Sequence, residues 1–389
     1  MIKFYFLCFF WILFFGCKNI IPSDKENNII SNNSNNITVL EKTKKPYILN
    51  KKINIPKNHT LIIKNGVKII LKNNGCFINS GNLEIGNNNY SDSSFLHDFN
   101  SERLDTIFYH NIEVYSKKKS VFLYNKNPNN LIIKNVLFKN IIINSINSNF
   151  SFLNSSFLNS DIINNNSIIK INNSFFYNTI IKNKNVNFLF NESIFSGLKN
   201  NIINDSVYKS TINNCLFTDL RDNLIFDKCF DNNIINSVFI NNSNSIIIEK
   251  GNRGYLKLHN NLFINNKVVL SIKDSCQFYL FNNSFIKNKN VLSSNLNKLT
   301  YKKIISKNNI FYNNNLNFKL KNILISNSYC ISNTDSLKGY YNISSSPLFV
   351  NEIEYNYNLS KNSPGFRSGI NNIDIGVNIN NINIIKYLN

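Results

Sequence analysis

Apolar and polar positions repeat regularly along the middle of this 389-residue chain. A phenylalanine anchors each repeat, and successive anchors are 19 to 26 residues apart. The nine anchors are Phe138, Phe157, Phe176, Phe195, Phe217, Phe239, Phe263, Phe285 and Phe311. Apolar residues stand five and seven positions before most anchors and alternate with polar or variable residues, which is typical of a strand with one buried face. Repeats of this length predict a solenoid in which each coil buries the apolar face of its neighbours.

Asparagine stands three residues before eight of the nine anchors, and Glu192 takes that place in the remaining repeat. Codon bias can enrich a chain in asparagine, but it does not place asparagine at one offset. Asparagine tolerates the left-handed backbone of a sharp turn. Stacked coils also bring equivalent amides to about 4.8 Å from one another, where they can hydrogen-bond. Each coil is therefore predicted to contain a short strand, an asparagine turn and a second strand with an inward phenylalanine.

A further apolar run lies between successive anchors, and in four consecutive repeats a carboxylate ends it. The four residues are Asp205, Asp227, Glu249 and Asp274. The first three are 22 residues apart, which matches the local coil length, whereas the last interval is 25 residues and needs a slightly longer turn. The spacing predicts a column of outward carboxylates along the solenoid axis.

Two interpretations of this column remain open. Stacked carboxylates repel one another unless a cation lies between them, so Asp205, Asp227 and Glu249 are candidate ligands for Ca²⁺. Arg253 could then contact an acidic sugar or act as a base, and carboxylates about 5 Å apart would also suit a retaining hydrolase. In the alternative interpretation, neighbouring lysines neutralise the acids as a surface ladder of ion pairs. These lysines are Lys228, Lys250 and Lys273.

The segments that flank the repeats complete the pattern. Residues 59–86 alternate apolar and polar positions with glycines at turns, and residues 346–376 contain Ser363-Pro364 and Asp374-Ile375-Gly376. Together with the repeats, these features resemble the right-handed parallel β-helix proteins, a fold shared by pectate lyases and bacterial surface β-helix repeat proteins. The resemblance implies an all-β chain that forms a single-stranded right-handed parallel β-helix (solenoid) with N- and C-terminal caps.

The N-terminus has the order of a secretory signal. Lys3 precedes a short apolar run that ends before Gly16-Cys17, so residues 1–16 are predicted to be a signal peptide. Cys17 resembles the lipidated cysteine of a bacterial lipoprotein, and residues 17–45 are predicted to be this lipidated cysteine and a polar tether. The remaining expected parts are opening coils and an irregular cap at 46–130, regular coils at 131–330 and a closing segment at 331–389.

These features predict a lipoprotein of the bacterial cell envelope, on the outer membrane or cell surface, whose membrane partner is lipid through Cys17. The formal net charge is +21, but only four of the 43 basic residues are arginine, so nucleic acid is not an expected partner. The chain contains no alanine and is rich in Asn, Ile and Lys, which indicates an AT-rich genome. Much of the basic charge therefore reflects codon bias and is weak evidence for an acidic partner.

The five cysteines after Cys17 lack the paired spacing of a zinc site, and we expect them to be buried thiols. A β-helix alone does not assign a function. We expect a monomeric glycan-binding or surface-structural protein without turnover. The alternative is a polysaccharide lyase or glycoside hydrolase that acts on an acidic polysaccharide. Its candidate catalytic residues are Asp205, Asp227, Glu249, Asp274 and Arg253.

Overall fold

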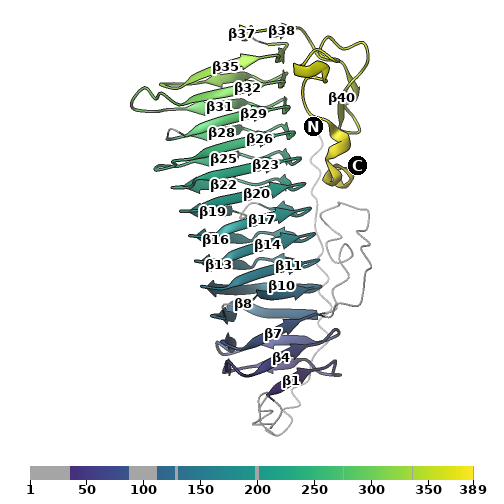
Figure 1. The fold of residues 1–389 in the computed structure, drawn as a ribbon. Helices are drawn as coiled ribbons and strands as arrows, with labels where there is room; N and C mark the ends of the chain where they lie inside the picture. Colours follow the sequence, from purple (N-terminus) through teal and green to yellow (C-terminus); the bar gives the residue numbers. More distant parts are fainter. Residues whose placement is uncertain are drawn as a thin grey trace, which may run out of the picture.

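The computed structural model describes residues 36–86, 112–127, 130–197, 201–274, 276–334 and 336–388. Apart from an antiparallel pair near the C-terminus, their strands pair in parallel from coil to coil and form one elongated solenoid (Figure 1). The predicted all-β, right-handed parallel β-helix is confirmed. The predicted signal peptide and Cys17 lie outside the described residues.

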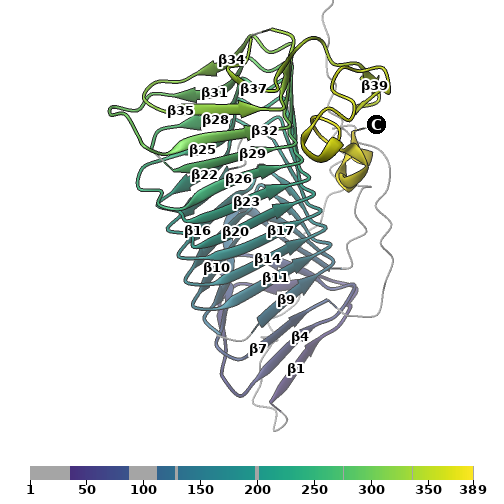
Figure 2. The same cartoon turned by 45° about the horizontal axis from the view of Figure 1, so that its top comes forward.

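Each regular coil contributes three strands, so the solenoid has three faces (Figures 1 and 2). The first face is a 14-stranded parallel sheet. Its strands are β1 (Ile37–Leu40), β4 (Thr60–Ile63), β7 (Asn82–Ile85), β9 (Asn130–Lys134), β11 (Asn149–Leu153), β14 (Ile168–Asn172), β17 (Asn187–Asn191), β20 (Lys209–Asn213), β23 (Asp231–Ile235), β26 (Tyr255–His259), β29 (Gln277–Phe281), β32 (Lys303–Lys307), β35 (Leu324–Ser328) and β37 (Gly339–Tyr340).

The second face consists of short strands that carry the anchors, here called the phenylalanine strands. They are β12 (Ser156–Leu158), β15 (Phe175–Tyr177), β18 (Ile194–Ser196), β21 (Leu216–Thr218), β24 (Val238–Ile240), β27 (Leu262–Ile264), β30 (Ser284–Ile286) and β33 (Ile310–Tyr312), followed by β36 (Ile331–Ser332) and β38 (Ile343–Ser344). The third-face strands are β13 (Asp161–Asn165), β16 (Ile180–Lys184), β19 (Asn201–Asp205), β22 (Asp222–Asp227), β25 (Asn244–Ile248), β28 (Val268–Ile272), β31 (Asn290–Ser294) and β34 (Leu316–Lys319).

The first coils are less regular. Their remaining strands are β2 (Tyr47–Leu49), β3 (Lys52–Ile55), β5 (Lys68–Leu71), β6 (Cys76–Asn79), β8 (Ile112–Asn125) and β10 (Val136–Ile146). The first strand, β1, lies within the range 17–45 that the sequence assigns to a tether, and it pairs in register with β4. Its four residues are too few to show a clear period, but pairing with β4 buries Leu40.

The nine anchors form one continuous column, as predicted. Phe176 pairs in register with Phe195, and their parallel rings have centroids 4.8 Å apart. Neighbouring rings along the rest of the column are 4.6 to 5.1 Å apart. The positions five and seven before an anchor also face inward; in the coil of Phe285 these are Leu280 and Phe278, both fully buried.

The residue three before each anchor forms a corner with left-handed backbone. All nine such residues, Glu192 included, have φ between 47° and 56°. Their amides bond from coil to coil at two places: Asn260 Nδ2 donates to Asn236 Oδ1 at 2.8 Å, and Asn173 Nδ2 donates to Asn154 Oδ1 at 2.7 Å. The predicted asparagine ladder is therefore confirmed at these rungs.

Two further asparagine ladders lie inside the upper coils, and the sequence analysis did not identify them. Asn261, Asn283 and Asn309 form one of them, two residues before their anchors. Asn242, Asn266, Asn288 and Asn314 form the other, three residues after theirs. Each buried amide donates to a backbone carbonyl of the coil before. Each also donates to the next rung, except at the last rungs, where Asn309 donates to Ser306 Oγ and Asn314 donates to Asn317 Oδ1, so no rung leaves its amide unpaired.

The C-terminal segment, residues 346–388, does not continue the stack but folds back along the solenoid (Figure 1). It contains β39 (Phe349–Asn351), β40 (Asn356–Leu359) and the 3₁₀ helices η1 (Ile370–Asn372), η2 (Ile379–Asn381) and η3 (Asn383–Tyr387). Its apolar side chains cover the outer side of the phenylalanine strands and form a second hydrophobic core there. Among the described residues, no helix is long and apolar enough to span a membrane.

Candidate functional site

The predicted site residues all lie along one corner of the solenoid, here called the charged edge. It consists of the turns that join the third-face strands β19, β22, β25, β28 and β31 to the first-face strands β20, β23, β26, β29 and β32. In Figure 1 this edge is on the left, opposite the C-terminal segment. The five turns extend over about 20 Å of the solenoid axis, at about 4.8 Å per coil.

Three of the four carboxylates stack as predicted, and the fourth does not. Asp205 pairs in register with Asp227. Glu249 follows in the next coil, where its backbone N–H donates to the Phe226 carbonyl. In the coil above, Ile272 pairs with Ile248, so Lys273 and not Asp274 comes next in the column. The interval of 25 residues to Asp274 exceeds the local coil by one, and the turn does not absorb the extra residue.

Lysines lie against these carboxylates. Lys228 Nζ is 3.2 Å from Asp227 Oδ2 and 3.6 Å from Asp205 Oδ1, and Lys273 Nζ is 2.5 Å from Glu249 Oε1. The hydrogen bond to Asp227 and the nearby charge of Asp205 raise the pKa of Lys228. All these side chains are substantially exposed, so each ion pair contributes little to stability. This geometry is that of the surface ladder of ion pairs.

No group of three or more His, Cys, Asp or Glu side chains is arranged for a metal ion within the part of the chain that the structure describes. Lys228 bridges the two carboxylates that a shared Ca²⁺ would have to bridge. Ca²⁺ binding by Asp205, Asp227 and Glu249 stays a prediction from sequence. Arg253 lies on the same edge with an exposed side chain, and its carbonyl accepts a hydrogen bond from Lys302 Nζ at 3.1 Å.

Aromatic side chains follow the charged edge, and the sequence analysis missed them. Tyr208 is 63% exposed, and its ring stacks on that of Phe230 with a centroid distance of 5.1 Å. On the adjoining first face, the half-buried Tyr255 contacts Tyr279 edge-on at 6.1 Å. Tyr208 and Phe230 stand nine positions before their anchors, Tyr255 stands eight before and Tyr279 six before. The signal in the sequence was the pair Tyr208 and Phe230, which share one offset in consecutive repeats, but inward positions alone define the predicted repeat.

A loop overhangs the upper end of the charged edge. The turn after β31 spans residues 295–302 and accounts for the longest interval between anchors, from Phe285 to Phe311. Leu299 in this loop is 67% exposed and Tyr301 is fully exposed. Beneath the loop lies a hollow of about 520 Å³, here called the edge hollow. Its lining residues are Lys250, Lys273, Asp274, Leu296, Asn297, Lys298, Leu299, Thr300 and Tyr301.

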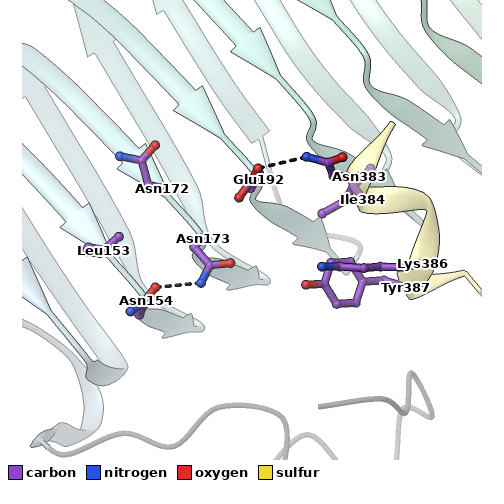
Figure 3. Close-up of a pocket in the computed structure, with 9 residues that line it drawn as sticks. All are labelled: Leu153, Asn154, Asn172, Asn173, Glu192, Asn383, Ile384, Lys386 and Tyr387. Carbon is purple, nitrogen blue, oxygen red and sulfur yellow. Dashed lines mark hydrogen bonds between the residues drawn. The ribbon is translucent and has the colours of Figure 1, made fainter. Parts of the chain in front are cut away.

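A second hollow, of about 460 Å³, lies where the C-terminal segment ends on the lower coils (Figure 3). Asn154 and Asn173 of the corner ladder line it, together with Glu192 and Tyr387. Asn383 Nδ2 donates to Glu192 Oε1 at 3.3 Å, so the exception in the asparagine column is a docking point for the C-terminal segment. None of the predicted site residues lies in this hollow.

No protein-family model matches the sequence, and no curated protein matches it. Among solved structures, the chain is similar to a mutant of the periplasmic alginate epimerase AlgG, with 10% identity and a TM-score of 0.43 over 76% of this chain and 78% of that chain. It is also similar to a tailspike protein of Escherichia coli bacteriophage HK620 in complex with a hexasaccharide, with 9% identity and a TM-score of 0.35 over 79% and 70% of the two chains. The assignment of the parallel β-helix rests on the strand register described above.

Proposed function

We propose that this chain is a lipid-anchored protein of the bacterial cell envelope that binds a polysaccharide, of acidic type, without turning it over. The observation that carries the proposal is the charged edge, where exposed aromatic rings, lysines and carboxylates follow one another along a straight corner. Tyr208 supplies an exposed ring of this edge, and the half-buried Tyr255 supplies one on the adjoining first face. A sugar ring has apolar C–H faces and polar rims, which aromatic and charged side chains complement together.

The rigidity of the edge supports binding of a polymer. Backbone pairing fixes each turn against the next, and the phenylalanine column beneath is close-packed. The backbone of such a frame is already fixed, so a bound chain does not have to order the turns. Because the turns repeat along the axis, an extended polymer would meet similar groups at successive coils.

Anchoring and location form the second half of the proposal. A cysteine after a short apolar run favours lipidation of Cys17 and a place on the outer membrane or the cell surface. A solenoid held there by a tether would present its edge to envelope or extracellular glycans.

Calorimetric titration of the purified full chain with a panel of neutral and acidic polysaccharides tests the binding. We expect a Tyr208→Ala/Tyr255→Ala variant to lose roughly tenfold in affinity, since it removes two ring contacts. Tyr340→Ala is the matched control, because Tyr340 is 77% exposed at the upper end of the first face and away from the charged edge.

Absence of binding to every polymer, or equal losses in both variants, would contradict the proposal. The same samples are assayed for new reducing ends and for the unsaturated products of a lyase. If the wild type turns the polymer over and an Asp205→Asn/Asp227→Asn variant does not, the protein is an enzyme and the proposal of binding without turnover is wrong.

A further inference from the structure

We propose that the edge hollow is a subsite for the anionic group of an acidic sugar residue, an inference that rests on the proposed polysaccharide binding. The hollow combines three lysines, one carboxylate and an overhanging aromatic loop in a single concave surface. Lys250 lies in the turn between β25 and β26, and the same turn contains the predicted site residues Glu249 and Arg253.

The charges in the hollow leave an excess of positive charge. Lys273 is paired with Glu249, and the Asp274 carboxylate accepts a hydrogen bond from the Gly251 backbone N–H. No ion pair within the described residues involves Lys250 or Lys298. The hollow therefore holds two ammonium groups without an ion-pair partner, those of Lys250 and Lys298, and one carboxylate, which is already hydrogen-bonded. This charge balance favours binding of an anion over binding of a cation.

The loop over the hollow is held in place by bonds to two other turns. Lys302 Nζ donates to the Arg253 carbonyl at 3.1 Å, and the Thr300 backbone N–H donates to the Asn322 carbonyl at 3.0 Å. Asn322 Nδ2 in turn donates to the Leu296 carbonyl at 2.6 Å. These bonds present the exposed ring of Tyr301 beside the lysines. A ring face next to ammonium groups suits a sugar that carries a carboxylate, whereas a small inorganic anion would gain nothing from the ring.

The first test uses a soluble uronic-acid homopolymer and the neutral polymer made from it by carboxyl reduction. We expect a Lys250→Ala/Lys298→Ala variant to bind the acidic polymer roughly tenfold more weakly and the reduced polymer unchanged. Its salt dependence should also be shallower, because fewer exposed charge pairs are screened. A Lys139→Ala/Lys170→Ala variant removes the same charge from two exposed positions on lower coils and is the control. Equal losses in the two variants would overturn the subsite.

The second test is a gain of affinity. Glu249→Gln releases Lys273 from its 2.5 Å partner and adds a third uncommitted ammonium to the hollow. We expect this variant to bind the uronic-acid polymer severalfold more tightly. Glu113→Gln releases Lys68 in the same way on a lower coil and should leave the affinity unchanged. A loss of affinity in Glu249→Gln, or an equal gain in Glu113→Gln, contradicts the proposal.

The two proposals fail in different ways. If the wild-type chain binds neither polymer, the polysaccharide-binding function itself is wrong. If it binds both equally and the Tyr208→Ala/Tyr255→Ala variant binds neither, the function holds and the anionic subsite is wrong.

Discussion

At the scale of single residues, asparagine serves two separate purposes in this solenoid. At corners it adopts left-handed backbone, as at Asn236 with φ of 51°, which most other side chains adopt only at a cost. Inside the upper coils it fills ladders in which each amide donates and accepts, as at Asn283. Glycine at a corner would keep the backbone unstrained but would remove side-chain bonds such as the one from Asn260 to Asn236, whereas an inner asparagine is needed for its amide alone.

The inner ladder gives a prediction at Asn283. This side chain accepts from the Asn261 backbone N–H and Asn261 Nδ2, and it donates to the Leu258 carbonyl. Asn283→Leu leaves these buried groups unpaired, so we expect the free energy of unfolding to fall by at least about 3 kcal/mol. Asn54→Leu, at an exposed strand position, is the control and should change little. Similar melting temperatures for the two variants would show that the ladder adds no stability.

The buried thiols give a prediction on pH. Burial raises the pKa of Cys215 to about 12, whereas an unfolded thiol titrates near about 8.5. The folded state therefore favours the neutral thiol, and this contribution is complete below about pH 8 and is lost as the pH rises toward 12. Serine occupies the equivalent place at Ser193 and Ser237, so Cys215→Ser fits the coil.

We expect Cys215→Ser to match the wild type at pH 7 and to exceed its free energy of unfolding by about 3 kcal/mol at pH 10.5. Denaturant titrations of both proteins at the two pH values measure the difference. Tyrosine and lysine ionisation affects both proteins alike and cancels in this comparison. An equal loss of stability in the two proteins at alkaline pH would mean that the thiol is not responsible.

At the scale of strands and coils, the sequence predicts what faces inward better than what faces outward. The phenylalanine column and the residues five and seven before it follow from spacing alone, because inward positions must be apolar in every coil. Leu216 and Val238, one residue before their anchors, are apolar for another reason: they face outward and are covered by the C-terminal segment. Which segment covers them depends on a long-range contact that no local period encodes.

The same limit applies to the charged edge. The register of Asp205, Asp227 and Glu249 follows from equal intervals, but the place of Asp274 depends on how one turn distributes an extra residue. The edge hollow depends on the direction of the loop after β31. The extra length of this loop is visible in the sequence as a long interval between anchors. The direction in which the loop extends, however, is set by the bonds of Lys302 and Thr300 to distant turns.

The covering segment gives a prediction at the element scale. Residues 346–388 bury Ile382 and Ile384 against the phenylalanine strands, and the segment's backbone bonds to corner asparagines, including Asn383 N–H to Asn214 Oδ1 at 3.0 Å. Deleting residues 346–389 exposes that apolar surface to water, so we expect self-association and a lower melting temperature. Light scattering and binding of a hydrophobic dye measure both effects.

A point variant distinguishes exposure of the apolar surface from the other effects of deleting the segment. Ile382→Asp places a charge in the second core and should cause a milder form of the same change, because Ile382 is only 1% exposed. Ile353→Asp, at a position of the same segment that is 90% exposed, should have no effect. A truncated chain that stays monomeric and melts like the wild type would show that the segment only rests on the solenoid.

At the scale of the whole molecule, the proposed binding and the proposed anchoring involve separate parts of the chain. The solenoid is a stack in which each coil contacts its neighbours, so the charged edge keeps its geometry along the axis. The chain before β1 has 36 residues, of which those after Cys17 could reach at most about 65 Å when fully extended. A lipid at Cys17 would therefore hold the first coil of the solenoid within that reach of the membrane.

Replacing Cys17 tests this arrangement in cells. Cys17→Ser removes the thiol that would carry the acyl chains, and a protein without them has no firm hold on a bilayer. We expect the variant to appear in the soluble fraction or to accumulate unprocessed, whereas the wild type fractionates with membrane. Cys76→Ser, a change at a buried thiol of the solenoid, should leave the fractionation unchanged. The purified Cys17→Ser chain should still bind the same polysaccharides, because the charged edge is built entirely by coils beyond residue 200. A variant that is processed normally and still sediments with membrane would mean that another part of the molecule holds it there.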